Sequence, residues 1–443
     1  MKKMRKSLTL LGLSLIILSC AKKEEKIELT PRDFHMAMDK LTSVIVHDIF
    51  SPPVASRIYA YSSVAGYEVM AQGDQNYKSI EGMVTNYSAT PKPNQKDLNY
   101  EMASIIAFLE VGKELIFSED LMNVYSDSLY NSWQEKNAKV FNDSKAYGME
   151  VADHVKAWLK EDNYSQTRTM PKFTVKSDDL SRWQPTPPMY MDGIEPHWSK
   201  IRPFAIDSAA QFKPVPHPEF SMEKNSNFYK ELMEVYTFGG GSPDKEKDKE
   251  RVEIASFWDC NPYVSMTKGH LMFATKKITP GGHWIGICKI ASEKAGADFS
   301  KTVYVYAKAS MAMADAFISC WDEKYSSNLI RPETIINNTF DESWLPVLQT
   351  PPFPEYTSGH SVVSGAASVI LTEIFGDNFA FEDTTELVYG LPVRSFGSFY
   401  EASSEAAISR LYGGIHYRAA IDNGLIQGKN LGHFVANKLE LVN

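Results

Sequence analysis

Apolar residues recur at three- and four-residue spacing along most of this chain, and this helical period constrains the fold more than any other feature. Alternating strand-like runs are almost absent. We therefore expect an all-α protein built from helical bundles, with one domain over residues 29–443. The nine prolines of residues 171–218 argue against long helices in that segment. The expected helices cover residues 33–49, 55–72, 99–117, 121–133, 144–161, 223–236, 245–258, 267–277, 289–324 (with a break near Gly296), 362–375, 398–412 and 415–439.

The first 19 residues have the pattern of a bacterial export signal and are set apart from the fold. A basic start precedes an apolar run, and Ile17-Leu18-Ser19-Cys20 resembles a lipobox. This pattern predicts cleavage before Cys20, lipidation of that cysteine, a polar tether over residues 20–28, and a protein anchored by lipid to the bacterial envelope, at the outer membrane or the periplasmic face. An ordinary signal peptide or a short membrane anchor is the alternative, although the apolar run is too short to span a bilayer comfortably.

The mature chain is acidic. Its formal net charge changes from −9 to −13 when the four basic residues of the leader are removed. An acidic protein argues against nucleic acid as a partner. Cys260, Cys288 and Cys320 have neither zinc-site nor disulfide-scaffold spacing, and we expect them to be small buried hydrophobic residues, with a disulfide as the less favoured alternative.

Three short stretches in the last third of the chain gather groups that bind anions. They read KYSSNLIRP (residues 324–332), TSGH (residues 357–360) and SRLYGGIH (residues 409–416). A tetrahedral oxyanion such as phosphate or vanadate needs fixed positive charge, bidentate donors and close backbone approach. Because these basic groups occur in an acidic chain, they favour a local, buried anion site.

The local sequence predicts how the first two stretches are held. Pro332 disfavours helical geometry at Arg331, so Lys324 should lie near a helix end and Arg331 on an extended connector. Ser358-Gly359-His360 precedes an apolar helix beginning near Ser361, and the backbone amides of such an N-terminus can bind an anion.

In the third stretch, Gly413-Gly414 should break a helix and thereby let Arg410 and His416 converge, with His416 at the start of the next helix. For each stretch alone, capping, surface or salt-bridged side chains are the preferred interpretation. The combination is what indicates a site.

All three stretches, in this order and at this spacing, are similar to the signature shared by type 2 phosphatidic acid phosphatases and vanadium-dependent haloperoxidases (K-x6-RP, PSGH and SR-x5-H). Further segments resemble the haloperoxidase branch, so that the resemblance spans most of the mature chain. These segments are residues 53–67, 198–204, 257–259, 313–325 and 351–360.

The resemblance implies an all-α fold and a vanadate cofactor in residues 321–422. The groups that would hold the equatorial oxygens of vanadate, or of phosphate, are Lys324, Arg331, Ser358, Gly359 and Arg410. The resemblance further implies that His416 binds vanadium through a ring nitrogen, and that His360 acts as acid and base toward hydrogen peroxide. Oxygen transfer to a halide would follow while vanadium stays fully oxidised.

Two aromatic residues resemble positions near the site in the fungal chloroperoxidase type. Trp321 and Phe353 would form a halide-binding wall, although ordinary core packing explains them equally well.

Two departures from the family pattern bear on the site. Thr357 replaces the proline of PSGH, which we expect to loosen the turn. The superfamily often has aspartate four residues after the last histidine, where this chain has Ala420. The residue that orients His416 must then come from elsewhere, and Asp259 is the candidate, with a surface or capping role as its alternative.

A second enzymatic interpretation uses the same pocket. An acid phosphatase would bind a phosphomonoester there, with His416 as the nucleophile and His360 protonating the leaving alcohol. The three stretches do not separate the two chemistries, and the upstream segments favour the haloperoxidase. A helical surface lipoprotein that binds nutrients without catalysis is a third interpretation, and it leaves the basic and imidazole groups without a role.

Overall fold

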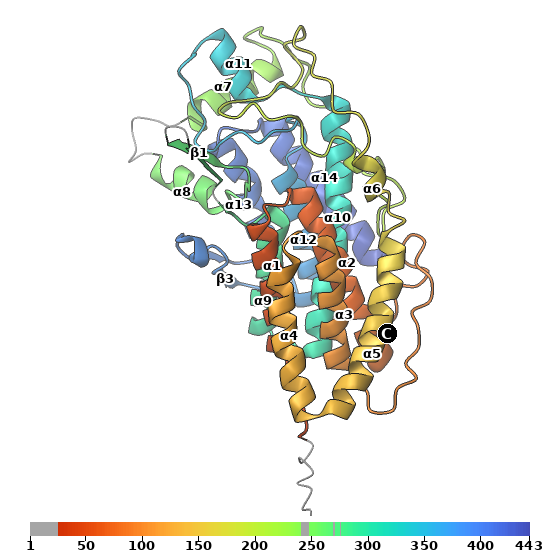
Figure 1. Cartoon of the computed structure of the whole chain (residues 1–443). Coiled ribbons are helices and arrows are strands. Elements are labelled where there is room, and N and C mark those ends of the chain that lie inside the picture. Colours follow the sequence, from red (N-terminus) through yellow and green to blue (C-terminus); the bar gives the residue numbers. More distant parts are fainter. Residues whose placement is uncertain (1–24, 241–247, 269–270, 275) are drawn as a thin grey trace, which may run out of the picture.

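The computed structural model describes residues 25–443 apart from residues 241–247, 269–270 and 275. The expected leader, the lipobox and Cys20 lie outside the described residues. Within them the chain is mostly helical, with two short two-stranded hairpins (Figure 1). The expected all-α class is confirmed.

The first five long helices form a bundle at one end of the molecule (Figure 1). Ser51 begins α2 by accepting a hydrogen bond from the backbone nitrogen of Val54 at 3.4 Å, and Pro52 follows at the first helical position. Residues 52–70 of α2 are all buried, so this helix lies inside the molecule with no solvent face. The five helices are α1 (Pro31–His47), α2 (Pro52–Gly73), α3 (Tyr100–Leu115), α4 (Glu119–Lys136) and α5 (Ala138–Leu159).

The helix α10 (Phe299–Ser327) is a second interior helix, and it connects this bundle to the rest of the fold. α9 (Pro280–Lys294) and α10 are separated at Gly296, whose φ of +61° is a conformation that favours glycine. The expected break is therefore confirmed, although α9 starts earlier than predicted. Residues 302–321 of α10 are buried, and α10 packs against both α2 and α12.

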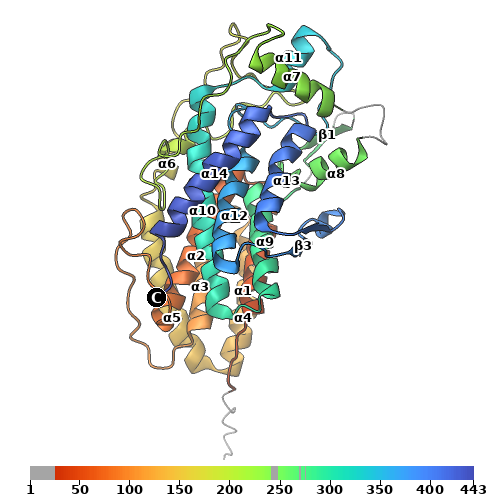
Figure 2. The same ribbon diagram turned by 180° about the vertical axis from the view of Figure 1, so that it is seen from behind.

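The last three long helices are α12 (Gly359–Phe375), α13 (Phe399–Tyr412) and α14 (Arg418–Lys438) (Figure 2). α12 and α14 pack against α10, and α13 packs against α12 and α14. Close approach of α12 and α14 depends on glycines spaced four residues apart along α14. A Cβ atom at Gly428 would lie 2.0 Å from the carbonyl oxygen of Val362, and one at Gly432 would lie 3.0 Å from that of Ala366. The two backbones are therefore in direct contact, which places the start of α12 beside the start of α14.

Shorter elements and irregular chain surround the long helices, some at the end of the molecule at which α10 finishes and others beside α9 (Figure 1). Residues 171–218 contain a single short helix, as their prolines predict. The shorter elements are α6 (Tyr164–Thr167), η1 (Trp198–Lys200), α7 (Asn227–Phe238), α8 (Lys249–Phe257), α11 (Pro332–Thr339), β3 (Phe381–Asp383), η2 (Leu387–Tyr389) and β4 (Arg394–Phe396).

The prediction of a helix over residues 267–277 is wrong. β1 (Ser265–Lys268) and β2 (Leu271–Ala274) pair antiparallel there, with Ser265 opposite Ala274. An apolar run of this length does not distinguish a strand from a short helix by periodicity, and backbone pairing between the two segments decides the outcome.

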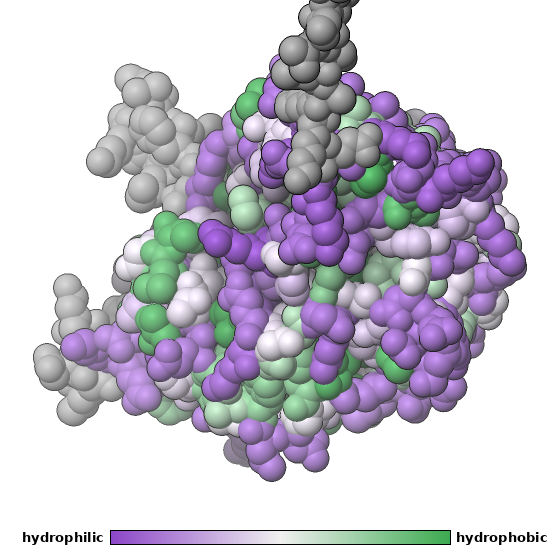
Figure 3. All heavy atoms as spheres, turned by 90° about the horizontal axis from the view of Figure 1, so that it is seen from below, coloured by the Kyte–Doolittle hydropathy of each residue, from purple (hydrophilic) through white to green (hydrophobic). Residues whose placement is uncertain are grey.

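None of the helices in the described part of the chain is both long enough and apolar enough to span a membrane. The face shown in Figure 3 is largely hydrophilic, with small hydrophobic groups between the polar side chains.

We predict that Gly428→Ala destabilises the fold by about 1–3 kcal/mol or more, because the new methyl group overlaps the backbone of α12. Gly281→Ala is the matched control. It also lies in a helix, but its Cβ would meet only Phe317, at 3.7 Å, so it should be neutral or stabilising by up to about 1 kcal/mol. Urea unfolding measures the free energy of unfolding of both variants. Equal stability of the two variants would contradict the assigned packing.

Candidate functional site

The fold brings the three stretches that are predicted to bind an anion close together, as the sequence predicts. Lys324 lies in the last turn of α10, which ends at Asn328 in the left-handed conformation, with φ of 50°. Arg331 follows in extended geometry as the N-cap of α11, with φ of −78° and ψ of 148°. Both side chains are fully buried.

The second stretch begins α12. The hydroxyl of Ser358 accepts a hydrogen bond from the backbone nitrogen of Ser361 at 3.3 Å and is the N-cap. The backbone nitrogen of Ser358 donates to the carbonyl of Ala420 in α14 at 3.0 Å. The helix starts at Gly359, slightly before the expected position, and the amide-rich N-terminus lies beside α14.

The third stretch turns between α13 and α14. Gly414 has φ of +77°, a conformation that favours glycine, and the chain turns away from the axis of α13 at this residue. Arg410 lies in the last turn of α13 and His416 lies two residues before α14 starts at Arg418. His416 therefore belongs to the turn and not to the next helix, which corrects the predicted boundary.

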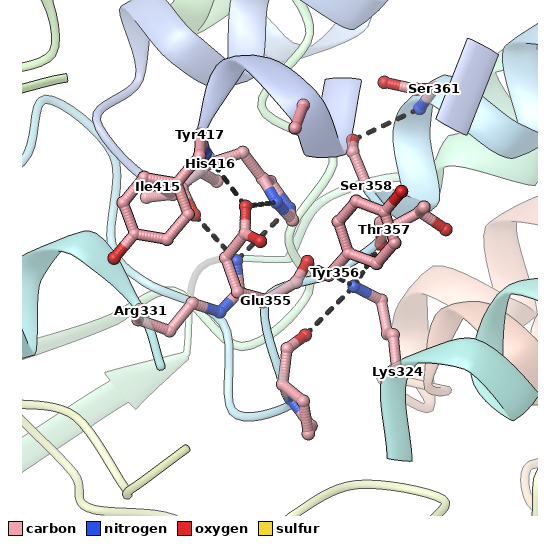
Figure 4. Close-up of polar contacts among 12 residues, drawn as sticks. Lys324, Arg331, Glu355, Tyr356, Thr357, Ser358, Ser361, Ile415, His416 and Tyr417 are labelled. Carbon is pink, nitrogen blue, oxygen red and sulfur yellow. Dashed lines mark hydrogen bonds and ion pairs between the residues drawn. The ribbon is translucent and has the colours of Figure 1, made fainter. Parts of the chain in front are cut away.

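A buried carboxylate orients His416 (Figure 4). The Nδ1 of His416 lies 2.8 Å from Oε1 of Glu355, and the backbone nitrogen of Tyr417 donates to the same oxygen at 2.8 Å. The Nη1 of Arg331 lies 3.2 Å from the other ring nitrogen, Nε2. Since a guanidinium only donates, Nε2 must carry a lone pair and Nδ1 the proton. This is the tautomer that leaves Nε2 able to act as a ligand or a nucleophile.

The expectation that Asp259 orients His416 is wrong. Asp259 instead forms an ion pair with Lys277, and its charge also favours the protonated form of Arg410. Glu355, which the resemblance did not single out, takes the predicted role. It lies three residues before Ser358 in the stretch that begins α12, and an acidic residue inside so apolar a segment (PPFPEYTSGH) was the available signal.

His416 is held in its neutral form. Burial lowers its pKa well below the ordinary value, and the charges of Arg331 and Lys324 lower it further. Burial raises the pKa of Glu355 to about 8, against the opposing effect of Arg331.

Lys324 is enclosed by backbone oxygens. Its ammonium donates to the carbonyls of Pro354 at 3.0 Å, Glu355 at 3.1 Å and Thr357 at 2.5 Å. All three donors are thus engaged, so that Lys324 would bind an oxyanion directly by exchanging one carbonyl. Burial lowers its pKa to about 7.

Arg331 has one donor available for a ligand. Its Nε donates to the carbonyl of Phe353 at 2.9 Å and its Nη1 to that of Ile415 at 2.8 Å. The buried Nη2 has no hydrogen-bond partner among the described residues. A buried donor without a partner is costly, and an anion at this point would satisfy it.

His360 presents a second unsatisfied nitrogen. A hydrogen bond with the main chain of Trp258 favours the charged form of the ring, so the ring donates to that carbonyl. In the part of the chain that the structure describes, Nε2 is buried and lacks a partner. Burial and the charge of Arg410 nevertheless lower the pKa of His360 well below its ordinary value.

One cavity collects most of the predicted residues. His360, His416, Arg410 and Gly359 line it together with Trp321 and Phe353, whose ring centroids are 5.0 Å apart. Two of the basic groups pack against Phe353 and do not line the cavity themselves: the Nζ of Lys324 lies 5.0 Å from the ring centroid and the Cζ of Arg331 lies 5.1 Å from it.

Thr357 does not loosen its turn, contrary to expectation. The residue is fully buried, and its hydroxyl donates to Oε1 of Gln427 at 2.7 Å. The amide of Gln427 in turn donates to Ser319 of α10 at 3.0 Å. These contacts tie the turn to two helices.

Comparisons with known proteins agree with this geometry. The family model described as VCPO second helical-bundle domain matches residues 304–343 and 337–443. Vanadium chloroperoxidase of Curvularia inaequalis is 28% identical over 178 residues, a match that covers 29% of this chain and only 29% of that relative.

Solved structures extend the similarity to the whole chain. A crystal structure described as the first bacterial vanadium-dependent iodoperoxidase is 61% identical, with a TM-score of 0.90, and the match covers 95% of this chain and 99% of that one. An apo-type bacterial vanadium-dependent chloroperoxidase has a TM-score of 0.64 at 15% identity, covering 88% and 94% of the two chains, and it shows the fold alone.

We predict that oxyanion affinity falls as the pH rises above 7. Below that pH Lys324, whose pKa burial lowers to about 7, is already protonated. Above pH 7 Lys324 must take up a proton when the anion binds, so the affinity falls by up to about tenfold per pH unit. Ionisation of Glu355, with its pKa of about 8, acts in the same direction because it adds negative charge. Sulfate keeps one charge state over this range, so calorimetry with sulfate measures the dependence.

Lys324→Arg is the control for this prediction, since arginine stays protonated throughout. Its affinity should decline less steeply between pH 7 and pH 8. The same steep decline in both proteins would show that Lys324 is not the group responsible.

Proposed function

Because this chain belongs to the vanadium-dependent haloperoxidase family, we propose that it uses vanadate to oxidise a halide with hydrogen peroxide, and that iodide is its substrate. The proposal of iodide is supported by the 61% identity to a protein described as an iodoperoxidase. The observation that carries the proposal is the neutral His416, whose Nε2 lone pair lies beside Arg331 while Glu355 holds Nδ1.

The residues present fit vanadate. A tetrahedral oxyanion requires several donors and one ligand nitrogen. The site offers the unpartnered Nη2 of Arg331 and the Nε2 of His416, which would exchange its hydrogen bond from Nη1 of Arg331 for the bond to vanadium. Bound vanadate supplies the Lewis-acid centre that activates peroxide for oxygen transfer to halide. The residues proposed to hold it are Lys324, Arg331, Ser358, Gly359, Arg410 and, as the vanadium ligand, His416.

The roles of these residues follow from their surroundings. Lys324 and Arg331 provide positive charge from within the protein, where a low dielectric strengthens its effect on an anion. His360 is the proton carrier, because its Nε2 has no partner among the described residues and its lowered pKa keeps the ring neutral and able to accept a proton from peroxide.

An apolar wall is proposed to receive the halide. Trp321 and Phe353 line the cavity beside His360 and His416, together with Phe317 and Pro52. A large, weakly hydrated halide is the anion best matched to such a surface, because its desolvation costs least.

We expect vanadate-dependent oxidation of iodide by peroxide after the protein has been dialysed with vanadate. His416→Ala should reduce it to background, because the proposed vanadium ligand is removed. The exposed His433 of α14 provides a matched control, His433→Ala, that should retain full activity. Aryl phosphate is assayed in parallel. Hydrolysis that vanadate inhibits, without halide oxidation, would contradict the proposal and favour the phosphatase.

We also propose that the mature protein is a lipoprotein of the bacterial envelope. The support is the lipobox before Cys20, which lies outside the described residues. Mass spectrometry of the N-terminal peptide should find Cys20 as a lipid-modified first residue, and Cys20→Ala should abolish membrane association. An unmodified chain that retains residues 1–19 would contradict this assignment.

A further inference from the structure

A second cluster of chemically active side chains lies next to the anion site but has no part in the proposed reaction. Cys260 follows α8, His283 lies in the first turn of α9, and Glu386 precedes η2. All three side chains are buried. The described cysteines are unpaired and buried, as expected from the sequence, so the thiol of Cys260 is not committed to a disulfide.

The three potential ligand atoms are close together. Sγ of Cys260 lies 3.5 Å from Nδ1 of His283 and 4.0 Å from Oε1 of Glu386, and Nδ1 lies 3.0 Å from Oε1. Tetrahedral zinc, with bonds of about 2.3 Å to sulfur and about 2.1 Å to nitrogen and oxygen, separates its ligand atoms by roughly 3.4–3.6 Å. The triangle formed by the three ligand atoms has nearly this size, and shifts of about half an ångström in their positions would give zinc-binding geometry.

The other nitrogen of His283 is held in the way typical of a metal ligand. Nε2 lies 2.8 Å from Oδ2 of Asp383, and Oδ1 of that carboxylate accepts from the backbone nitrogen of Thr385 at 2.9 Å. The ring also stacks on Trp258, with centroids 4.4 Å apart. A carboxylate on the distal nitrogen fixes the ring and raises its basicity, as in carboxylate–histidine–zinc sites.

Without a metal, a proton would occupy the position between these ligands. Burial disfavours charge on His283, but Asp383, Cys260 and Glu386 together raise its pKa well above the ordinary value. A zinc ion replaces two protons, one from Nδ1 of His283 and one from the thiol of Cys260. The cluster, counted with Asp383, keeps a net charge of −1 in both states, so the exchange adds no buried charge.

We propose that Cys260, His283 and Glu386 bind one zinc ion, with Asp383 as the residue that positions His283. Thiolate, imidazole and carboxylate are all zinc ligands, and the thiolate disfavours magnesium and calcium. Three protein ligands leave one coordination position for water. Sequence spacing did not indicate this site, because its ligands are 23 and 103 residues apart (283 minus 260, and 386 minus 283) and converge only in the fold.

The ion would brace a wall of the anion cavity. Cys260 lines that cavity with Arg410 and His360, whereas Glu386 and Asp383 come from the segment around β3. Zinc would join this segment and the Cys260 segment to α9. No step of the proposed halide chemistry uses this ion, so the site does not depend on that chemistry.

Cobalt provides a direct probe, because a thiolate bound to Co²⁺ gives an intense charge-transfer absorption. The full chain, freed of metal with a chelator and free of vanadate, is titrated with Co²⁺ and then with Zn²⁺. We expect one cobalt per chain with this absorption, and its loss when zinc displaces cobalt. Cys260→Ser should abolish the band. Cys288→Ser should retain the band, since Cys288 is likewise a buried, unpaired cysteine but lies in α9, outside the cluster.

Asp383→Asn provides a second test in case circular dichroism shows that Cys260→Ser does not fold. It retains all three ligands and should weaken cobalt affinity about 10–100-fold. The proposal is overturned if the folded native chain shows no thiolate band at stoichiometric cobalt, or if Asp383→Asn binds cobalt with unchanged affinity. Either result can occur whether or not the protein oxidises iodide, so the two proposals fail separately.

Discussion

The hydrogen bond between Glu355 and His416 is the interaction on which the rest of the site depends. It places the proton on Nδ1 and leaves a lone pair on Nε2, beside the guanidinium of Arg331. The basic residues also hold the segment that carries Glu355, because Lys324 donates to three of its carbonyls and Arg331 to that of Phe353. The positive charges and the orienting carboxylate therefore belong to one buried network. Each of these donors satisfies a buried backbone carbonyl, which would otherwise lack a hydrogen bond and destabilise the fold.

Helix packing makes this network rigid. The backbone contact between α12 and α14 at Gly428 brings Ser358 to the carbonyl of Ala420, and Thr357 is tied to Gln427 nearby. The site is thus assembled where α10 ends, α12 and α14 begin, and α13 turns back, and few of its groups depend on exposed chain. A preorganised arrangement of this kind stabilises charge without reorganising during the reaction.

Much of this could be predicted from the sequence, for identifiable reasons. The long helices follow from apolar periodicity, and the connector at Arg331 follows from Pro332. Residues 267–277 were predicted wrongly because a short apolar run does not encode whether it pairs as strands. Asp259 was named as the residue that orients His416, and Glu355 was not considered, because its position depends on the fold of the segment before α12, which no local pattern specifies. The cluster around His283 was missed for the same reason, since its members are brought together only by tertiary contacts.

The protonation state of His416 is the most direct test of the central claim. Nitrogen-15 NMR of histidine-labelled protein distinguishes a ring nitrogen that carries a proton from one with a lone pair, and the His416→Gln variant assigns the signals. At neutral pH, without vanadate, the account predicts a protonated Nδ1 and an unprotonated Nε2, with the opposite tautomer or a mixture in Glu355→Gln. An imidazolium at His416, or a proton on Nε2 in the native protein, would contradict it.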